Sequence, residues 1–274
     1  MKQLLSIIVV LIIVSLGKIS ASFAIQVDEG FTEIVSEHFR ARFLTSSDRE
    51  LARRALDRAE YLYKRVARDI GYSRYDGYWT WEKRAGIILF PDQISFSRFT
   101  GQPAWSVGYA SRESIFFHNK TIVSFSGQAN FFDEVLPHEL THLMFWDYFD
   151  RHIASVPVWF EEGVAQLEET GKRGIAKDAL RPVVQSGKHI QFRVLGNLRP
   201  SELNQDAQVG IYYAESLSII VFLVEKYGQE AFYQLIKELR GGQSFEKALT
   251  RSYGGIFKSM DDLEGRWVRY ILDE

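Results

Sequence analysis

The chain has 274 residues, of which 46% are hydrophobic and 25% are charged, and this composition excludes a disordered or collagen-like protein. The net charge of −2 gives no indication of the basic surface with which proteins bind nucleic acids. The absence of cysteine excludes disulfides, thiol catalysis and thiolate-bound zinc, so any transition-metal site must use His, Asp and Glu.

The first residues have the pattern of a targeting segment. Lys2 gives a positive start, and residues 4–16 are almost entirely apolar. This run has the length of a signal-peptide core, whereas a membrane span needs about 18 residues or more. With cleavage after Ala24, residues 1–24 form a signal peptide, and the protein is exported to the periplasm or outside the cell. The alternative is an uncleaved anchor, in which residues 4–24 attach the protein to a membrane.

The N-terminal half is predicted to contain mainly strands. Residues 39–44 alternate between apolar and polar side chains, as a half-buried strand does. Ser47, with Glu50 three residues later, has the pattern of a capping box, and it opens a helix that Gly71 ends. One face of this helix carries Leu51, Ala55, Leu56, Ala59, Leu62, Val66 and Ile70. Further strands are expected at residues 85–90, 105–109, 114–117 and 121–125.

The pattern becomes helical after residue 130. Helices are expected at residues 132–145, from Pro157 onward, and at 211–227, 230–239, 244–251 and 261–272. The stretch 171–209 is polar and poorly periodic, which predicts a link between two lobes of about residues 25–170 and 171–274. Strands that precede helices along the chain are typical of an α+β fold.

The segment His138-Glu139-Leu140-Thr141-His142 carries the most specific chemical signal. On a helix, His138 and His142 lie on the same face because they are four residues apart, so both imidazoles can reach one metal ion. Neutral imidazoles bind Zn²⁺ well, and the ion lowers the pKa of a bound water. Glu139 lies beside them and can take the proton of that water. The spacing therefore predicts a hydrolytic zinc site.

An amphipathic helix with two ordinary histidines is the alternative explanation of this segment. A catalytic zinc ion needs a third protein ligand and one open position. Glu161 and Glu162 lie about twenty residues downstream on a predicted helix, and they point about 100° apart. Glu162 is favoured as the ligand because it precedes Gly163, where the missing side chain would let another helix approach. The presence of this candidate third ligand favours a metal site over a helix with two ordinary histidines.

With HELTH followed by PVWFEEGVA, the chain resembles the gluzincin metallopeptidases, and more closely the peptidase MA-like proteins. The resemblance extends from about Glu37 to Tyr270. It implies two lobes with one zinc ion in the cleft between them, held by His138, His142 and the glutamate before glycine, Glu162. It also implies that a tyrosine or a histidine of the C-terminal lobe stabilises the oxyanion. Tyr213 fits that position best, and its neighbour Tyr212 is the alternative.

Several other side chains have two interpretations. Residues 105–110 fit either an edge strand that pairs with an extended substrate or an ordinary internal strand. His189 is expected to be a solvated loop residue, with oxyanion stabilisation as its alternative role. Gln166 is expected to lie at the surface, with a hydrogen bond to a ligand histidine as the alternative. The remaining histidines are expected to be structural: His38, His118 and His152.

These observations predict a secreted or envelope zinc metallopeptidase that hydrolyses peptide bonds of a peptide or protein substrate. Glu139 and Tyr213 are the predicted catalytic residues, and zinc is the predicted cofactor. The alternative function is a non-catalytic envelope protein in which the same site staples two lobes for partner binding. A purely structural site has no need of Glu139, which favours the enzyme.

Overall fold

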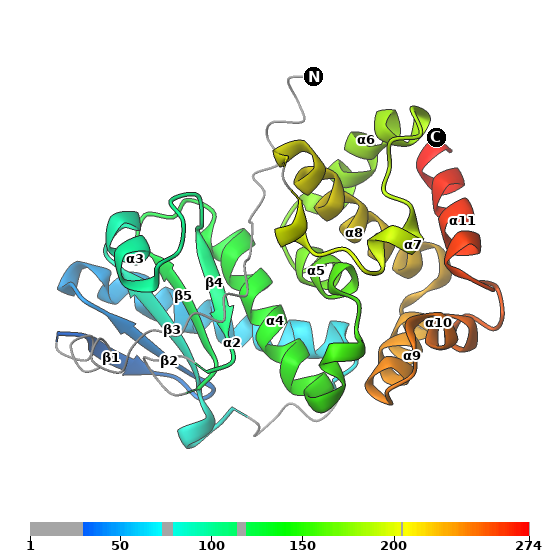
Figure 1. Cartoon of the computed structure of the whole chain (residues 1–274). Helices are drawn as coiled ribbons and strands as arrows, with labels where there is room; N and C mark the ends of the chain where they lie inside the picture. The colour runs from blue at the N-terminus through cyan, green and yellow to red at the C-terminus, as the bar shows by residue number, and fades with distance from the viewer. Residues whose placement is uncertain (1–29, 73–78, 114–118, 204, 274) are drawn as a thin grey trace. The chain divides into compact units, whose positions relative to one another are not determined.

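The computed structural model describes residues 30–72, 79–113, 119–203 and 205–273. The predicted signal segment and the predicted strand at 114–117 lie outside the described residues. The described residues form two compact units, an N-terminal unit of residues 30–146 and a C-terminal unit of residues 147–273 (Figure 1).

The described part of the N-terminal unit contains a five-stranded sheet with the strand order β1-β2-β3-β5-β4. Its strands are β1 (Thr32–Val35), β2 (Phe39–Phe43), β3 (Ala85–Phe90), β4 (Gly108–Ser111) and β5 (Thr121–Phe125). The three central strands β2, β3 and β5 are parallel, whereas β1 and β4 are antiparallel edge strands. The predicted strands at 39–44, 85–90 and 121–125 are confirmed, and β1 was not predicted. The strand predicted at 105–109 begins only at Gly108.

Helices cover both faces of this sheet, which is why all of β3 is buried. Register pairs Ala41 with Ile87, on the face where Phe39 of β2 meets Tyr63 of helix α2 (Arg49–Asp69), with ring centroids 5.8 Å apart. The opposite face of β3 and β5 forms a core cluster with helix α3 (Gln93–Thr100): Ile88, Phe90, Phe96, Val123 and Phe125. A strand buried on both faces reads as a continuous apolar run, as residues 85–90 do.

The ends of α2 and α3 have different caps. The predicted apolar face of α2 is buried from Ala55 to Ile70, whereas Leu51, its first residue, is half-buried. The predicted capping box is wrong, because a short 3₁₀ turn, η2 (Ser46–Asp48), precedes α2 and Thr45 Oγ1 donates to the carboxylate of Asp48. Helix α3 was not predicted, although Asp92 accepts a 2.7 Å hydrogen bond from the backbone N–H of Ser95 and caps it.

Helix α4 (Leu136–Phe149) follows one π-helical turn, η4 (Phe131–Val135), and confirms the helix predicted at 132–145. A Cβ added to Gly108 would lie 2.6 Å from Cγ1 of Val135, so the start of β4 and the start of α4 are in close contact. The guanidinium of Arg54 in α2 lies 4.7 Å from the ring centre of Phe132. The start of α4 therefore lies on the face of the sheet that α2 covers.

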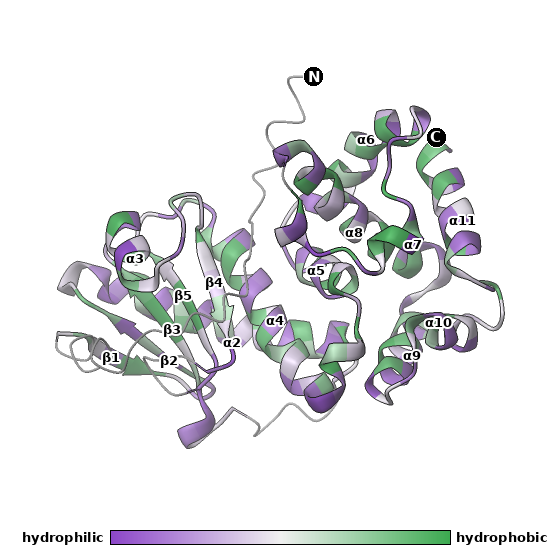
Figure 2. Ribbon diagram, viewed as in Figure 1, coloured by the Kyte–Doolittle hydropathy of each residue, from purple (hydrophilic) through white to green (hydrophobic). Residues whose placement is uncertain are grey.

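The described residues of the C-terminal unit form helices and connecting loops and contain no strand. Its helices are α5 (Val158–Leu167), α6 (Lys172–Gln185), α7 (Phe192–Leu195), α8 (Asp206–Tyr227), α9 (Gln229–Arg240), α10 (Phe245–Ser252) and α11 (Met260–Leu272). Helices α5, α6, α9 and α11 pack against α8. Helices α9 and α11 are hydrophobic on one side and hydrophilic on the other (Figure 2). Helix α8 is long and apolar enough to cross a membrane, but 72% of its apolar window is buried, as in the core helix of a soluble protein.

The expected link at 171–209 is wrong, because this stretch contains α6 and α7. Helix α5 packs with the C-terminal helices, so the division between the units falls at residue 146, ahead of the predicted lobe boundary near residue 170. The protein is a mixed α+β protein with its strands in the N-terminal part and mainly helices after them, as the sequence predicted.

Candidate metal centre

Helix α4 places the two imidazoles of the HELTH segment side by side. The Nε2 atoms of His138 and His142 lie 3.1 Å apart, and both side chains are buried. Two facing imidazole nitrogens can share only one proton between them. Two nitrogens bound tetrahedrally to Zn²⁺ at about 2.0–2.1 Å lie about 3.3 Å apart. The observed separation is close to that value, so the donor atoms fit one metal ion.

The surroundings of this pair are largely apolar. The ring of Trp146, one turn after His142, stacks on it with centroids 5.9 Å apart and planes at 29°. The predicted apolar face of the helix is confirmed, since Leu136, Leu140 and Leu143 are all buried. Burial strengthens the interaction between a metal ion and its ligands because it lowers the local dielectric constant.

Glu139 lies between the two histidines in the first turn of α4, and its side chain is fully buried. A buried carboxylate is costly unless its charge is compensated. Since the imidazoles are neighbours along the same helix, a cation that they bind would lie near this carboxylate and stabilise its charge. His138, Glu139 and His142 are therefore all buried on the same helix, α4.

Glu162 lies in α5 of the C-terminal unit and is only 5% exposed, whereas Glu161 is half-buried. The predicted role of Gly163 is borne out by the packing of α5 on α8. A Cβ added to Gly163 would lie 2.4 Å from the carbonyl oxygen of Ser216 and 2.7 Å from Cγ1 of Ile220. Only glycine permits this approach, and it fixes the helix turn that carries Glu162.

Tyr212 and Tyr213 are both buried in α8. The backbone carbonyl of Tyr213 accepts a 3.0 Å hydrogen bond from the side-chain amide of Gln166. Gln166 is therefore not the surface residue that was expected, and it joins α5 to α8.

The hydroxyl of Tyr212 has no hydrogen-bond partner among the described residues. Burial, followed by the negative charges of Glu162 and Glu161, raises the pKa of Tyr212. The influence of Glu162 on Tyr212 agrees with the packing of α5 against α8.

His189 is paired with a carboxylate in the C-terminal unit. Its Nε2 lies 3.0 Å from Oε1 of Glu264 in α11, and the other oxygen of Glu264 accepts a 2.9 Å hydrogen bond from the N–H of Phe192. The expectation of a solvated loop histidine is therefore wrong. His152 lies against Gly242, which agrees with a structural role, and His118 lies outside the described residues.

Glu215 is a buried carboxyl group that the sequence analysis did not single out. It lies in α8, and its Oε1 accepts a 2.9 Å hydrogen bond from the N–H of Ile190. Its Oε2 has no hydrogen-bond partner among the described residues. Burial raises the pKa of Glu215 to about 8, and the negative charge of Glu264 adds to the increase. The signal in the sequence was a glutamate within the most apolar helix of the chain.

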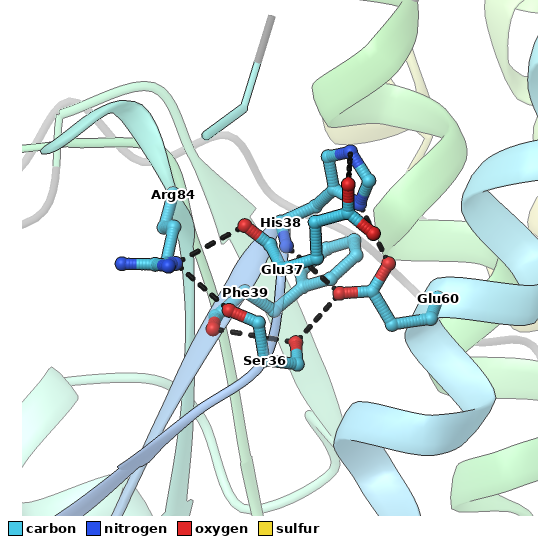
Figure 3. Close-up of polar contacts among 6 residues, drawn as sticks. All are labelled: Ser36, Glu37, His38, Phe39, Glu60 and Arg84. Carbon is cyan, nitrogen blue, oxygen red and sulfur yellow. Dashed lines mark hydrogen bonds and ion pairs between the residues drawn. The ribbon is translucent and has the colours of Figure 1, made fainter. Parts of the chain in front are cut away.

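A second histidine and carboxylate group lies where β1 turns into β2, next to α2 (Figure 3). Glu37, His38 and Glu60 each have a ligand-type atom within 4.8 Å of the others. Glu60 accepts hydrogen bonds from Ser36 Oγ at 2.6 Å, from the N–H of His38 at 2.8 Å and from Nδ1 of His38 at 2.7 Å. The carboxylate is thus engaged by protein donors, and the group joins the turn to α2. His38 has the structural role that was expected.

A family model described as the Peptidase MA superfamily matches residues 89–273, which include α4, α5 and α8. No curated protein matched the chain. The match extends over more than half of the sequence and includes both the buried HELTH helix and the Glu162 helix. The chain belongs to the peptidase MA superfamily.

Proposed function

We propose that the protein is a zinc-dependent metallopeptidase of the gluzincin type that cleaves peptide bonds in a peptide or protein substrate. The observation that carries this proposal is the pair of imidazole nitrogens of His138 and His142, 3.1 Å apart on a buried helix that also carries Glu139. Membership of the peptidase MA superfamily supports the same chemistry.

The proposed ligands are His138, His142 and Glu162. Each is buried and offers one atom of a kind that binds zinc. Two imidazoles and one carboxylate are a common ligand set of hydrolytic zinc sites, and such a set leaves one position open. When bound, zinc acts as a Lewis acid that polarises the scissile carbonyl group and lowers the pKa of water. A closed structural site would need a fourth protein ligand, which distinguishes this proposal from the non-catalytic alternative.

Glu139 is the proposed general base and acid. Its carboxylate takes a proton from the attacking water and later passes that proton to the amine that leaves. Glu139 is buried on the same helix as the two proposed histidine ligands, which suits this role. Tyr213 is the proposed donor that stabilises the oxyanion, and Tyr212 is the alternative donor.

The substitution Glu139→Gln tests the proposal most directly. We expect the variant to keep its fold and its zinc, because Glu139 is not a proposed ligand, while kcat falls by about a hundredfold or more. The measurement combines metal content with cleavage of a peptide library by the purified full-length protein. A variant that cleaves as fast as the wild type would refute the mechanism.

Export to the periplasm or the cell exterior is also proposed, on the basis of the charged start and short apolar run of residues 1–24. The N-terminal residue of the mature protein distinguishes cleavage after Ala24 from an uncleaved anchor. An intact Met1 in the membrane fraction would favour the anchor.

A further inference from the structure

Arg112 lies directly after the edge strand β4, and its side chain is exposed. Its guanidinium carbon lies 5.1 Å from the ring centre of Trp146 in α4. The ring of Trp146 also stacks on that of His142, with ring centroids 5.9 Å apart. All three side chains belong to the N-terminal unit. They form a continuous stack from the surface to a proposed zinc ligand, which we call the Arg112 stack.

The contact with Trp146 holds the guanidinium in place without using its hydrogen-bond donors. A cation–π contact involves the face of the guanidinium, whereas its five N–H donors point outward in the plane of the group. Across the described parts of the chain, Arg112 makes no hydrogen bond or ion pair. Its neighbour Glu113 is exposed and does not pair with it. Within the described residues, the donors of this positioned arginine are thus available to a partner.

The location of Arg112 restricts what that partner can be. Since the stack has separations of 5.1 and 5.9 Å, the guanidinium carbon lies within about 11 Å of the His142 ring. An extended peptide rises about 3.3 Å per residue, so this distance corresponds to about three residues. A planar guanidinium with free donors matches the two oxygens of a carboxylate.

We propose that Arg112 is a specificity-determining residue that binds a carboxylate of the substrate, within about three residues of the scissile bond. The carboxylate belongs either to an Asp or Glu side chain or to the free C-terminus of the peptide. This inference rests on the proposed peptidase function. The other explanation of the Arg112 stack is that the arginine merely covers Trp146, and that explanation involves no preference for charged peptides.

The test measures peptide binding to the zinc-loaded Glu139→Gln protein, so that cleavage does not interfere. Peptides are compared in matched pairs, Glu against Gln at each position and a free against an amidated C-terminus. We expect the carboxylate member of at least one pair to bind about three- to fivefold more tightly, an effect that weakens with added salt because Arg112 is exposed. The pair that shows the preference identifies the source of the carboxylate.

Two further substitutions, made in the Glu139→Gln protein, test whether Arg112 causes the preference for carboxylate peptides. Arg112→Gln should abolish it and Arg112→Glu should reverse it, with unchanged zinc content in both. Arg98→Gln is the matched control, because Arg98 is an exposed arginine of α3 outside the Arg112 stack. Equal binding of the paired peptides by the Arg112-containing protein would overturn the inference, as would a preference that survives in Arg112→Gln. Cleavage by the protein with Glu139 intact is measured separately, so a failed peptidase function and a failed carboxylate preference give different results.

Discussion

In the N-terminal unit, His38 and the pair of His138 and His142 are all buried, but their ring nitrogens have different partners. Nδ1 of His38 lies 2.7 Å from Glu60, which also accepts hydrogen bonds from Ser36 and from the backbone of His38. The Nε2 atoms of His138 and His142 face each other instead. The two groups contain similar residue types, and the difference lies in the ring nitrogens: that of His38 faces a carboxylate, whereas those of His138 and His142 face one another.

The titration of Glu60 agrees with this difference. Burial alone would raise the pKa of Glu60, but the hydrogen bonds from Ser36 and His38 outweigh burial and lower it. A carboxylate stabilised in this way is an internal tie between the turn and α2. The comparison teaches that proximity of histidine and carboxylate is insufficient evidence for a metal site, and that the arrangement of the donor atoms around one point must be considered as well.

The largest effect is expected from removing one histidine of each group. His142→Ala should lose bound zinc and with it all peptidase activity, because a ligand is removed. His38→Ala should keep one zinc per chain and lower the free energy of unfolding by about 1–3 kcal/mol, because the buried bond to Glu60 is lost. Metal analysis and denaturant unfolding of both variants give the answer. Loss of zinc in His38→Ala would remove the distinction between the two groups.

A second pair of substitutions tests which of two adjacent glutamates is the third zinc ligand. Glu162→Ala should lose tightly bound zinc, whereas Glu161→Ala should keep it, because Glu162 is buried before Gly163 and Glu161 is half-buried. Zinc titration against a chelator measures both affinities. The reverse result would move the ligand by one residue, and zinc retained in both variants would place the third ligand elsewhere.

Glu215 is a buried carboxyl group that differs from Glu60, because only one of its oxygens accepts a hydrogen bond among the described residues. Its folded-state pKa of about 8 exceeds the ordinary value of 4.5, so between these values the folded protein binds more protons than the unfolded chain. The free energy of unfolding should therefore fall as pH rises through this window, by at most about 1.4 kcal/mol per pH unit. Glu215→Gln should remove this slope in unfolding measurements at several pH values. Glu225→Gln, at an exposed position of α8, is the control. An unchanged slope in Glu215→Gln would contradict this account.

The smallest expected effect distinguishes the two adjacent tyrosines. Tyr213→Phe should lower kcat by about tenfold with little change in zinc content, because a contact formed only in the transition state is lost. Tyr212→Phe should have less effect if Tyr213 is the donor. The hydroxyl of Tyr212 is buried and has no hydrogen-bond partner among the described residues, so Tyr212 is the alternative donor. A larger loss in Tyr212→Phe would assign the oxyanion role to that residue.

The sequence predicted those elements in which apolar residues are either continuous or spaced as one buried face requires. Helix α4 and strand β3 were located within a few residues because their neighbours bury them on several sides. Helix α6 was missed because its buried residues form a narrow line, Ala176, Leu180 and Val184, and because Pro182 lies inside the helix. Strand β4 was predicted three residues early because the aromatic Trp105 looked like a strand residue, although it is 47% exposed.

The candidate site was predictable only where its residues are close in the sequence. The four-residue spacing of His138 and His142 requires nothing beyond helix geometry. The bond between His38 and Glu60 joins residues 22 positions apart, and that between His189 and Glu264 joins residues 75 apart. No local pattern encodes such pairs, because tertiary packing alone brings them together. The Arg112 stack has the same origin.

Gly163 has a consequence for how this protein can change over time. Even alanine, the smallest replacement, would place an atom against the main chain of α8, which unlike a flexible side chain cannot turn away. A homologue in which Gly163 is replaced must therefore also carry a change in α8, or α5 shifts and the position of Glu162 is lost. We expect the two residues to be inherited together or lost together, and distant relatives that retain only one of them to have given up the reaction.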